Sequence, residues 1–172
     1  MSGLSKKIEL IANVSIILVA ILLGTLLLKE YRIKKSDKPT TISAGTKLAL
    51  PGIDWAKSEQ TLLLVLQKGC HFCADSAPFY KRLVEEFGNR GTIKLIALLP
   101  QDSGEAKEYL NELGINIDNI RTVNPSSLGV TGTPTVLLID RSGVVKGVWV
   151  GRLPADGESE ILTRLRVKSE SE

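Results

Sequence analysis

The two cysteines of the chain, Cys70 and Cys73, are the residues whose types and spacing most directly suggest chemistry. They are the only cysteines in 172 residues and stand three apart in the sequence Cys-His-Phe-Cys. A buried-strand pattern precedes them and a helical pattern follows, so we expect Cys70 at a helix N-terminus, where free amide groups and the helix dipole favour a thiolate. Cys73, one turn on, would then be close enough to attack a mixed disulfide on Cys70. The pair predicts dithiol exchange, with Cys70 as nucleophile and Cys73 as resolving thiol.

Metal binding is the alternative interpretation of the same cysteines. A structural zinc site needs four ligands, and a soft copper site needs further His or Met ligands. The chain offers only His71, which is trapped between the cysteines, and no methionine beyond Met1. We therefore expect no metal site, and no cofactor other than the redox-active disulfide that the cysteines can form. A metal-binding protein or a non-catalytic binding module stays open as the alternative function.

Three neighbouring residues are candidates for tuning the thiols. A protonated His71 would favour a nearby thiolate, and Lys68 adds positive charge two residues before Cys70. His71 and Phe72 are the two intervening residues, which help to set the reduction potential of such a pair. Two of them also have a plain interpretation. His71 is then a solvated side chain at a helix start. Lys68 is then a solvated loop lysine, and for Lys68 this plain interpretation is the better one.

Alternating strand and helix patterns surround the motif. Apolar runs predict strands at 61–67 and 92–99, and apolar residues at helical spacing predict a helix that follows the cysteines and ends at Gly88. A second helix is expected from Asp102 to Gly114, and a last one over 156–167. Strands at 135–140 and 144–150 flank a three-residue turn and predict a hairpin. This order predicts an α/β fold, a three-layer sandwich with a mixed β-sheet.

The N-terminal segment predicts a membrane anchor. Residues 10–28 contain no charged side chain, and as a helix they would span about 28 Å, close to the hydrocarbon core of a bilayer. Charged residues follow directly at 29–32, which favours an uncleaved signal anchor over a cleaved signal peptide. We expect an anchor in the lipid bilayer at 1–31, a polar linker at 32–45 and a folded domain at 46–172.

Charge and composition bear on the partners and the side of the membrane. The chain carries 22 Lys+Arg against 19 Asp+Glu, with 43% apolar residues, which excludes a disordered chain and predicts no nucleic-acid partner. More basic residues follow the span than precede it, and this alone would keep the domain in the cytoplasm. Disulfide chemistry favours the outside. We therefore expect a single-pass membrane protein with its domain on the extracytoplasmic, periplasmic side.

Two stretches carry a resemblance to a known family. The sequences KGCHFCADSAPFYKRL at 68–83 and GVTGTPTVLLIDRSGVVKGVWVGRL at 129–153 resemble thioredoxin-fold domains, and most resemble the membrane-anchored TlpA/ResA-type thiol-disulfide oxidoreductases. The resemblance covers about 58–168 and implies an extra helix and strand between Cys73 and Pro134. It also implies that Pro78 kinks the active-site helix, that Pro134 is a cis-proline facing the disulfide, and that Thr133 contacts a bound peptide backbone.

The departures from this family matter as well. Gly69 replaces the tryptophan usual before the first cysteine, Leu64 replaces the acid that thioredoxins bury, and Ser76 replaces the glutamate of some cytochrome c maturation members. With no obvious buried acid, general exchange with protein thiol or disulfide substrates is expected rather than cytochrome maturation itself. The resemblance implies a reductant, and since the anchor contains no cysteine, a separate membrane redox partner must renew it.

Overall fold

The computed structural model describes residues 9, 14–26, 41–88 and 91–169, with side chains to 166. It divides into two units, Met1–Pro39 and Thr40–Glu172. In the first unit, residues 14–26 form a helix whose apolar side chains are exposed, Leu18 by 62%. No helix within the described residues is long and apolar enough to span a bilayer. The predicted span at 10–28 includes residues 10–13 and 27–28, which lie outside the described residues, so the anchor stays a prediction.

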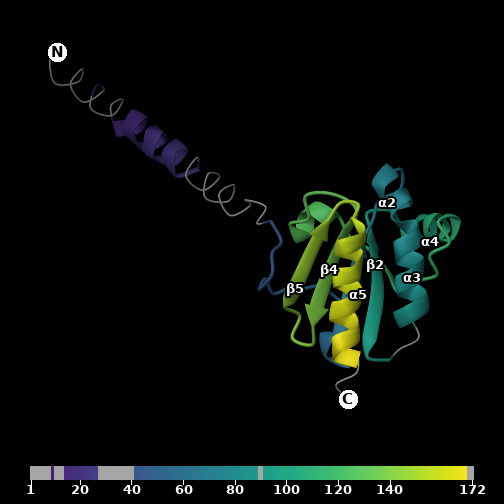
Figure 1. Ribbon diagram of the computed structural model, residues 1–172. Coiled ribbons are helices and arrows are strands. Elements are labelled where there is room, and N and C mark those ends of the chain that lie inside the picture. The colour runs from purple at the N-terminus through teal and green to yellow at the C-terminus, as the bar shows by residue number, and fades with distance from the viewer. Residues whose placement is uncertain (1–8, 10–13, 27–40, 89–90, 170–172) are drawn as a thin grey trace, which may run out of the picture. The chain divides into compact units, whose positions relative to one another are not determined.

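A five-stranded mixed sheet organises the second unit (Figure 1). Its order is β3-β2-β1-β4-β5. The strands β1 (Gln60–Val65), β2 (Ile93–Leu99) and β3 (Ile120–Thr122) are parallel, while β4 (Thr135–Asp140) and β5 (Val145–Val150) complete the sheet antiparallel to their neighbours. The mixed sheet confirms the predicted class. The sequence pattern does not predict β3, because three residues, Ile-Arg-Thr, are too few to show a period; only the resemblance implied an extra strand.

The helix that follows the cysteines is broken into two. It consists of α2 (His71–Asp75) and α3 (Ala77–Phe87), which meet at Ser76, with Pro78 in the first turn of α3. A proline cannot donate an amide hydrogen bond to the preceding turn, so a new helix begins around it. This break confirms the kink that the resemblance implied at Pro78.

The next helix confirms the predicted capping residue. In α4 (Ser103–Glu112), the carboxylate of Asp102 accepts hydrogen bonds from the amides of Gly104 at 2.9 Å and Glu105 at 3.0 Å. These bonds satisfy two of the amides that a helix N-terminus leaves free. Gly114 follows the helix with φ of +69°, a backbone conformation that other residues rarely adopt.

Three helices cover one face of the sheet. Figure 1 shows α3 and α5 (Ala155–Ser169) lying against the strands on the near side. Leu62 and Leu64 of β1 pack there among Leu83, Leu110 and Leu165, one from each of α3, α4 and α5. All of these side chains are essentially inaccessible to solvent. Because Leu63 and Val65 of the same strand face the opposite core, β1 is buried on both sides, as its continuous apolar sequence predicts.

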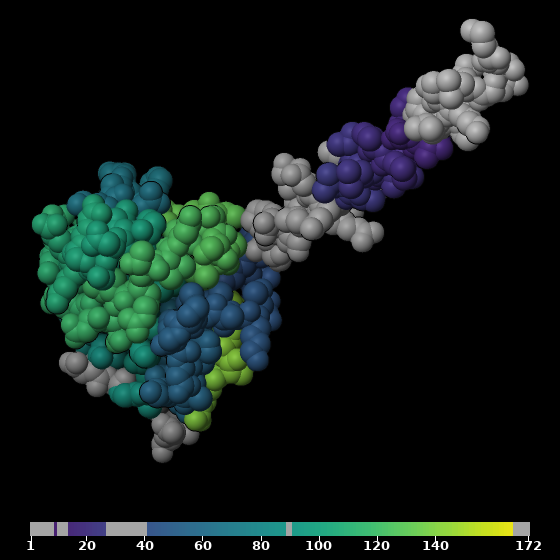
Figure 2. Space-filling view, turned by 180° about the vertical axis from the view of Figure 1, so that it is seen from behind, coloured from purple at the N-terminus to yellow at the C-terminus, as the bar shows by residue number. Residues whose placement is uncertain are grey.

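The opposite face is covered by irregular chain and not by α-helices, which corrects the predicted three-layer sandwich. The layer contains residues 41–54, the short 3-10 helices η1 (Trp55–Lys57) and η2 (Pro125–Leu128), and the residues after η2 (Figure 2). Ile42, Leu48 and Leu50 supply its apolar contacts. Pro51 and Gly52 form a turn within this segment, and such residues oppose a continuous helix. Among the described residues, every α-helix of the domain lies on the other face.

Residues 41–45 belong to the folded domain, which corrects the predicted end of the linker at 45. Ile42 is only 5% exposed, and its amide donates to the carbonyl of Gly129 at 2.9 Å. The amide of Gly45 donates to the carbonyl of Val145 at 2.8 Å. A single apolar residue in a polar stretch shows no period, so only its packing partners reveal that it is structural. Residues 32–40 of the predicted linker lie outside the described residues.

The predicted hairpin is confirmed, with Asp140 organising its turn. The Asp140 carboxylate accepts hydrogen bonds from the amides of Ser142 at 2.9 Å and Val144 at 3.0 Å, and Gly143 has φ of +78°. Burial alone would raise the pKa of Asp140, but hydrogen bonds from Ser142, Val144 and Lys146 hold it well below its usual range. The turn fixes the register of β4, whose first residue follows Pro134.

Candidate functional site

Cys70 occupies the N-cap of α2, as its sequence position predicts. Its half-buried sulfur accepts a hydrogen bond from the amide of Cys73 at 3.2 Å. Gly69, with φ of +79°, turns the chain between the end of β1 and the cap. An amide that donates to sulfur stabilises a thiolate more than a neutral thiol. The local geometry therefore suits Cys70 as the reacting sulfur.

Cys73 is buried, with no solvent exposure. Burial, together with a hydrogen bond with Cys70, raises the pKa of its thiol to about 12, against smaller opposing effects of the Gln67 backbone and the Thr133 side chain. A buried thiol of this kind is a poor nucleophile toward solvent reagents. It can react only with a partner brought to it, and Cys70 is that neighbour.

The residues just before β4 lie beside the cysteine motif, although they are distant from it in the sequence. The Thr133–Pro134 peptide bond is cis, and the carbonyl of Thr133 accepts a hydrogen bond from the thiol of Cys70 at 3.4 Å. Pro134 is buried, and its own carbonyl accepts from the amide of Gly151 at 2.7 Å. The cis geometry implied by the resemblance is confirmed. The contact of Thr133 with a bound peptide stays a prediction.

The three candidate tuning residues lie around the motif in different environments. The side chain of His71 is 82% exposed, with its Nε2 3.4 Å from a carboxylate oxygen of Asp75. Phe72 is also exposed, by 54%. The Lys68 ammonium is 3.0 Å from Glu105 of α4, a hydrogen bond that raises the pKa of Lys68. The charge of Lys68 is thus already paired, and the tuning roles of all three residues stay predictions.

Sequence reasoning missed Arg152 at this site. Its guanidinium lies 3.5 Å from the same Asp75 oxygen that faces His71. Arg152 directly follows Gly151, whose amide supports the cis-proline, so this ion pair joins α2 to the chain after β5. The two residues stand 77 positions apart, and no local pattern in the sequence could pair them.

Leu64 and Ser76 stand at the two positions where the families that this sequence resembles carry an acid. Leu64 is buried in the core, and the hydroxyl of Ser76 donates to the carbonyl of Phe72 at 2.8 Å. The buried polar residues within the described part of the chain are Gln60, Thr61, Ser76 and Thr135. Within that part, then, no carboxylate is buried near Cys73, in agreement with the sequence departures.

Among the described residues, no further side chains join the two cysteines to form a metal site. No group of three His, Cys, Asp or Glu side chains comes together in that part of the chain. His71 lies on the exposed side of α2 while Cys73 faces the core, so the motif residues do not converge on one point.

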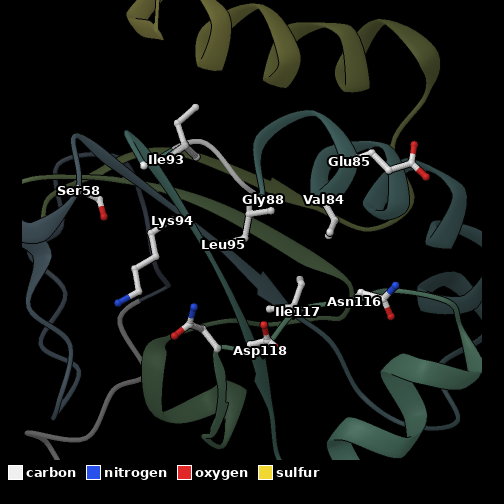
Figure 3. Close-up of a pocket in the computed structure, with 12 residues that line it drawn as sticks. Ser58, Val84, Glu85, Gly88, Ile93, Lys94, Leu95, Asn116, Ile117 and Asp118 are labelled. Atoms are coloured by element: carbon white, nitrogen blue, oxygen red, sulfur yellow. The ribbon is translucent and has the colours of Figure 1, made fainter.

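The hollow drawn in Figure 3 is separate from the cysteines. It measures about 530 Å³ and lies between the start of β2, the end of α3 and residues 116–119, with Lys94 and Glu85 among its polar lining. Cys70 follows the C-terminal end of β1, and the parallel strand β2 begins at the hollow. The hollow is therefore at the opposite end of the sheet and is not part of the dithiol site.

Comparisons with solved structures identify the fold. A protein described as the thiol:disulfide interchange protein DsbE from Chlorobium tepidum is 26% identical, with a TM-score of 0.53 over 72% of this chain and 94% of that one. A thioredoxin-family interchange protein from the same organism is 20% identical, with a TM-score of 0.53 over 72% and 98%. The thioredoxin domain of a Bacteroides vulgatus thiol-disulfide oxidoreductase is 17% identical, with a TM-score of 0.55 over 73% and 99%.

The chain has a thioredoxin-like fold. No protein-family model and no curated protein matches its sequence. The matched structures correspond in size to the thioredoxin-like domain, since the domain covers more than nine tenths of each of the three. Within this fold the chain contains a Cys70–Cys73 pair, and its structural neighbours are thiol-disulfide oxidoreductases.

Proposed function

We propose that the protein is a membrane-tethered thiol-disulfide oxidoreductase that reduces disulfides in protein substrates through Cys70 and Cys73. One observation carries the proposal: the Cys70 sulfur, partly accessible, lies between the amide of Cys73 and the carbonyl of Thr133 beside a cis-proline. The 26% identical interchange protein from Chlorobium tepidum supports it.

The asymmetry of the two thiols supports an order of steps. The Cys70 thiolate attacks a substrate disulfide, forming a mixed disulfide and releasing one substrate thiolate. Buried Cys73 then attacks Cys70, releasing the second substrate thiolate and leaving a Cys70–Cys73 disulfide. Thr133 and Pro134 would hold the substrate chain beside Cys70. The substrate leaves with two electrons that the protein must recover from another dithiol.

The renewal of this dithiol implies a separate membrane redox partner. The predicted anchor contains no cysteine, and so cannot carry electrons across a bilayer by thiol exchange. Residues 14–26 form a helix whose exposed side chains are mostly apolar, which supports an anchor over 10–28. We place the domain on the extracytoplasmic side, because disulfide exchange persists in oxidising compartments. A reporter fused after α5 tests this, and activity of a cytoplasm-specific reporter contradicts it.

Insulin reduction by the detergent-solubilised full chain tests the proposed activity. We expect turnover with dithiothreitol as donor and complete loss in Cys70→Ser. When reduced Cys73→Ser is mixed with insulin after removal of dithiothreitol, we expect a trapped mixed disulfide, because Ser cannot resolve it. The Ser142→Ala variant, altered in the distant hairpin turn, serves as the matched control. Equal activity of wild type and Cys70→Ser would support the non-catalytic binding module instead.

The reduction potential of the Cys70–Cys73 pair tests the proposal that the protein acts as a reductant. Equilibration against thiol buffers should give a value near or below about −250 mV, in the range of thioredoxin. A value near about −120 mV, as for DsbA, would instead indicate a disulfide donor.

A further inference from the structure

A groove with two arginines adjoins the dithiol site on the helical face of the sheet. It measures about 640 Å³ and lies between the end of α2, the first turns of α3 and the start of α5. Its walls contain Arg82 and Arg152 together with the carboxylates of Asp75 and Glu158, and most of the remaining lining is apolar. We call it the arginine groove. The proposed steps of thiol exchange use none of these four side chains.

The arginine groove is connected to Cys70 along two segments of the chain. Asp75 ends α2, the helix that Cys70 caps, so these two residues are about 7.5 Å apart along the helix axis. On the other side, Arg152 follows Gly151, whose amide donates to the carbonyl of Pro134 at 2.7 Å. Because each residue of an extended chain adds about 3.3–3.6 Å, a substrate segment reaches the groove about two to four residues from its own cysteine.

The two arginines of the groove are only loosely paired. The contacts of Arg152 with Asp75 and of Arg82 with Glu158 each measure 3.5 Å and involve one nitrogen of the guanidinium. Elsewhere in the described part of the domain, arginine–carboxylate pairs measure 2.6, 2.7 and 2.8 Å. A guanidinium has five N–H donors, so a single long contact leaves most of them available to another acceptor.

Solvent exposure favours an anion over a cation as the occupant of the groove. The side chains of Arg152 and Arg82 are 61% and 49% exposed, whereas those of Asp75 and Glu158 are only 29% and 27% exposed. A molecule that arrives from solvent therefore contacts the guanidiniums more readily than the carboxylates. A planar guanidinium can hold a carboxylate through two parallel hydrogen bonds.

We propose that the arginine groove binds an acidic segment of the protein substrate, with Arg152 pairing with a Glu or Asp side chain near the substrate cysteine. The inference rests on the proposed function and adds the class of substrate that the site prefers. The substrate carboxylate competes with Asp75 for the guanidinium of Arg152. This contact holds the substrate disulfide beside Cys70 during the first step, and Arg152 itself takes no part in the exchange of thiols.

Three synthetic peptides that differ only in charge test the inference with the detergent-solubilised full chain. Each probe is a disulfide-linked dimer of one short peptide, in which the residues three positions before and after the cysteine are both Glu, both Gln or both Lys. The measurement is the second-order rate constant at which the reduced protein, freed of dithiothreitol, reduces each peptide. At low salt we expect the Glu peptide to react about fivefold faster than the Gln peptide, the size of a well-formed exposed ion pair. In about 0.5 M salt this ratio should fall toward one, because salt screens exposed charges.

Two substitutions in the arginine groove should change this ratio in opposite directions. Arg152→Gln removes the cation and should bring the ratio of the Glu to the Gln peptide close to one. Asp75→Asn removes the competing carboxylate and should raise the ratio above that of the wild type. Both substitutions break the same ion pair, so a purely structural role of that pair predicts shifts in the same direction. The ratio also cancels any effect on the thiols, since both peptides react with the same Cys70.

A distant arginine supplies the matched control. Arg141 is 58% exposed and is also paired with a carboxylate, that of Glu59 at 2.7 Å. It follows Asp140, which lies opposite Gln60 at the start of β1, so it is at the end of the sheet away from Cys70. Arg141→Gln changes the net charge by the same amount and should leave the ratio unchanged.

The shape of the guanidinium gives a second variant. Arg152→Lys keeps the charge without the planar pair of donors and should retain only part of the preference. An unchanged ratio in Arg152→Gln, or equal drops in Arg152→Gln and Arg141→Gln, would overturn the inference. Faster reduction of the Lys peptide would also overturn it, because the groove would then bind basic segments. If the wild type reduces none of the peptides, the proposed function itself fails. If it reduces all three at the same rate, only the inference fails.

Discussion

Selective alkylation should distinguish the two thiols, because the structure predicts that Cys73 reacts much more slowly than an ordinary cysteine. Its pKa is raised from 9.0 to about 12, mainly by burial, so its thiolate fraction at pH 8 falls about thousandfold. A more basic thiolate is a better nucleophile. With a Brønsted slope of about 0.4–0.5, the rate constant of the Cys73 thiolate is about 16-fold to 32-fold higher, which offsets part of the loss. Cys73 should therefore react about 30-fold to 60-fold more slowly than an ordinary cysteine, before steric exclusion is counted.

The assay uses iodoacetamide on the reduced protein, with the alkylated residues located by mass spectrometry. Cys73→Ser isolates the first thiol and Cys70→Ser isolates the second. In Cys70→Ser the largest cause of the raised pKa, burial, remains, so the slow reaction should persist. Between pH 8 and pH 10 the rate for Cys73 should rise about tenfold per pH unit without levelling off. In urea, both thiols should react at ordinary rates. Alkylation of Cys73 in the folded protein within threefold of its rate in urea would refute the reasoning.

Two further predictions concern stability. Leu83→Ala deletes a fully buried side chain of α3 and should cost about 2–5 kcal/mol in urea unfolding; a cost below about 1 kcal/mol would show that the core relaxes around the cavity. Asp140→Asn should cost about 1 kcal/mol at pH 7 by weakening the charge-assisted bonds of the hairpin turn. Because the pKa of Asp140 is lowered on folding, its contribution is present above the unfolded value of 3.8 and is lost as the pH falls through the folded value. The difference between wild type and Asp140→Asn should therefore shrink below about pH 4, and an unchanged difference at pH 2 would contradict this assignment.

Local patterns predicted those parts of the fold in which each residue acts with its neighbours. The apolar run of β1, the hairpin turn around Gly143 and the cap at Asp102 depend on a few adjacent residues, and the structure confirms all three. Elements without a local signal were missed. The three residues of β3 show no period, and Ile42 is a lone apolar residue whose structural role depends on its contact with Gly129.

For the candidate site, the sequence by itself determined the chemistry available: two thiols three residues apart at a helix start, and no acid at Leu64 or Ser76. Residue type and short spacing are sufficient for this, because a helix turn places Cys73 beside Cys70 whatever surrounds it. Only the tertiary structure decided how much the two thiols differ in burial and pKa, and which distant residues contact them. Burial sets the raised pKa of Cys73, and the carbonyl of Thr133 reaches Cys70 across 63 residues. Desolvation and contacts of this kind arise only when distant segments pack together.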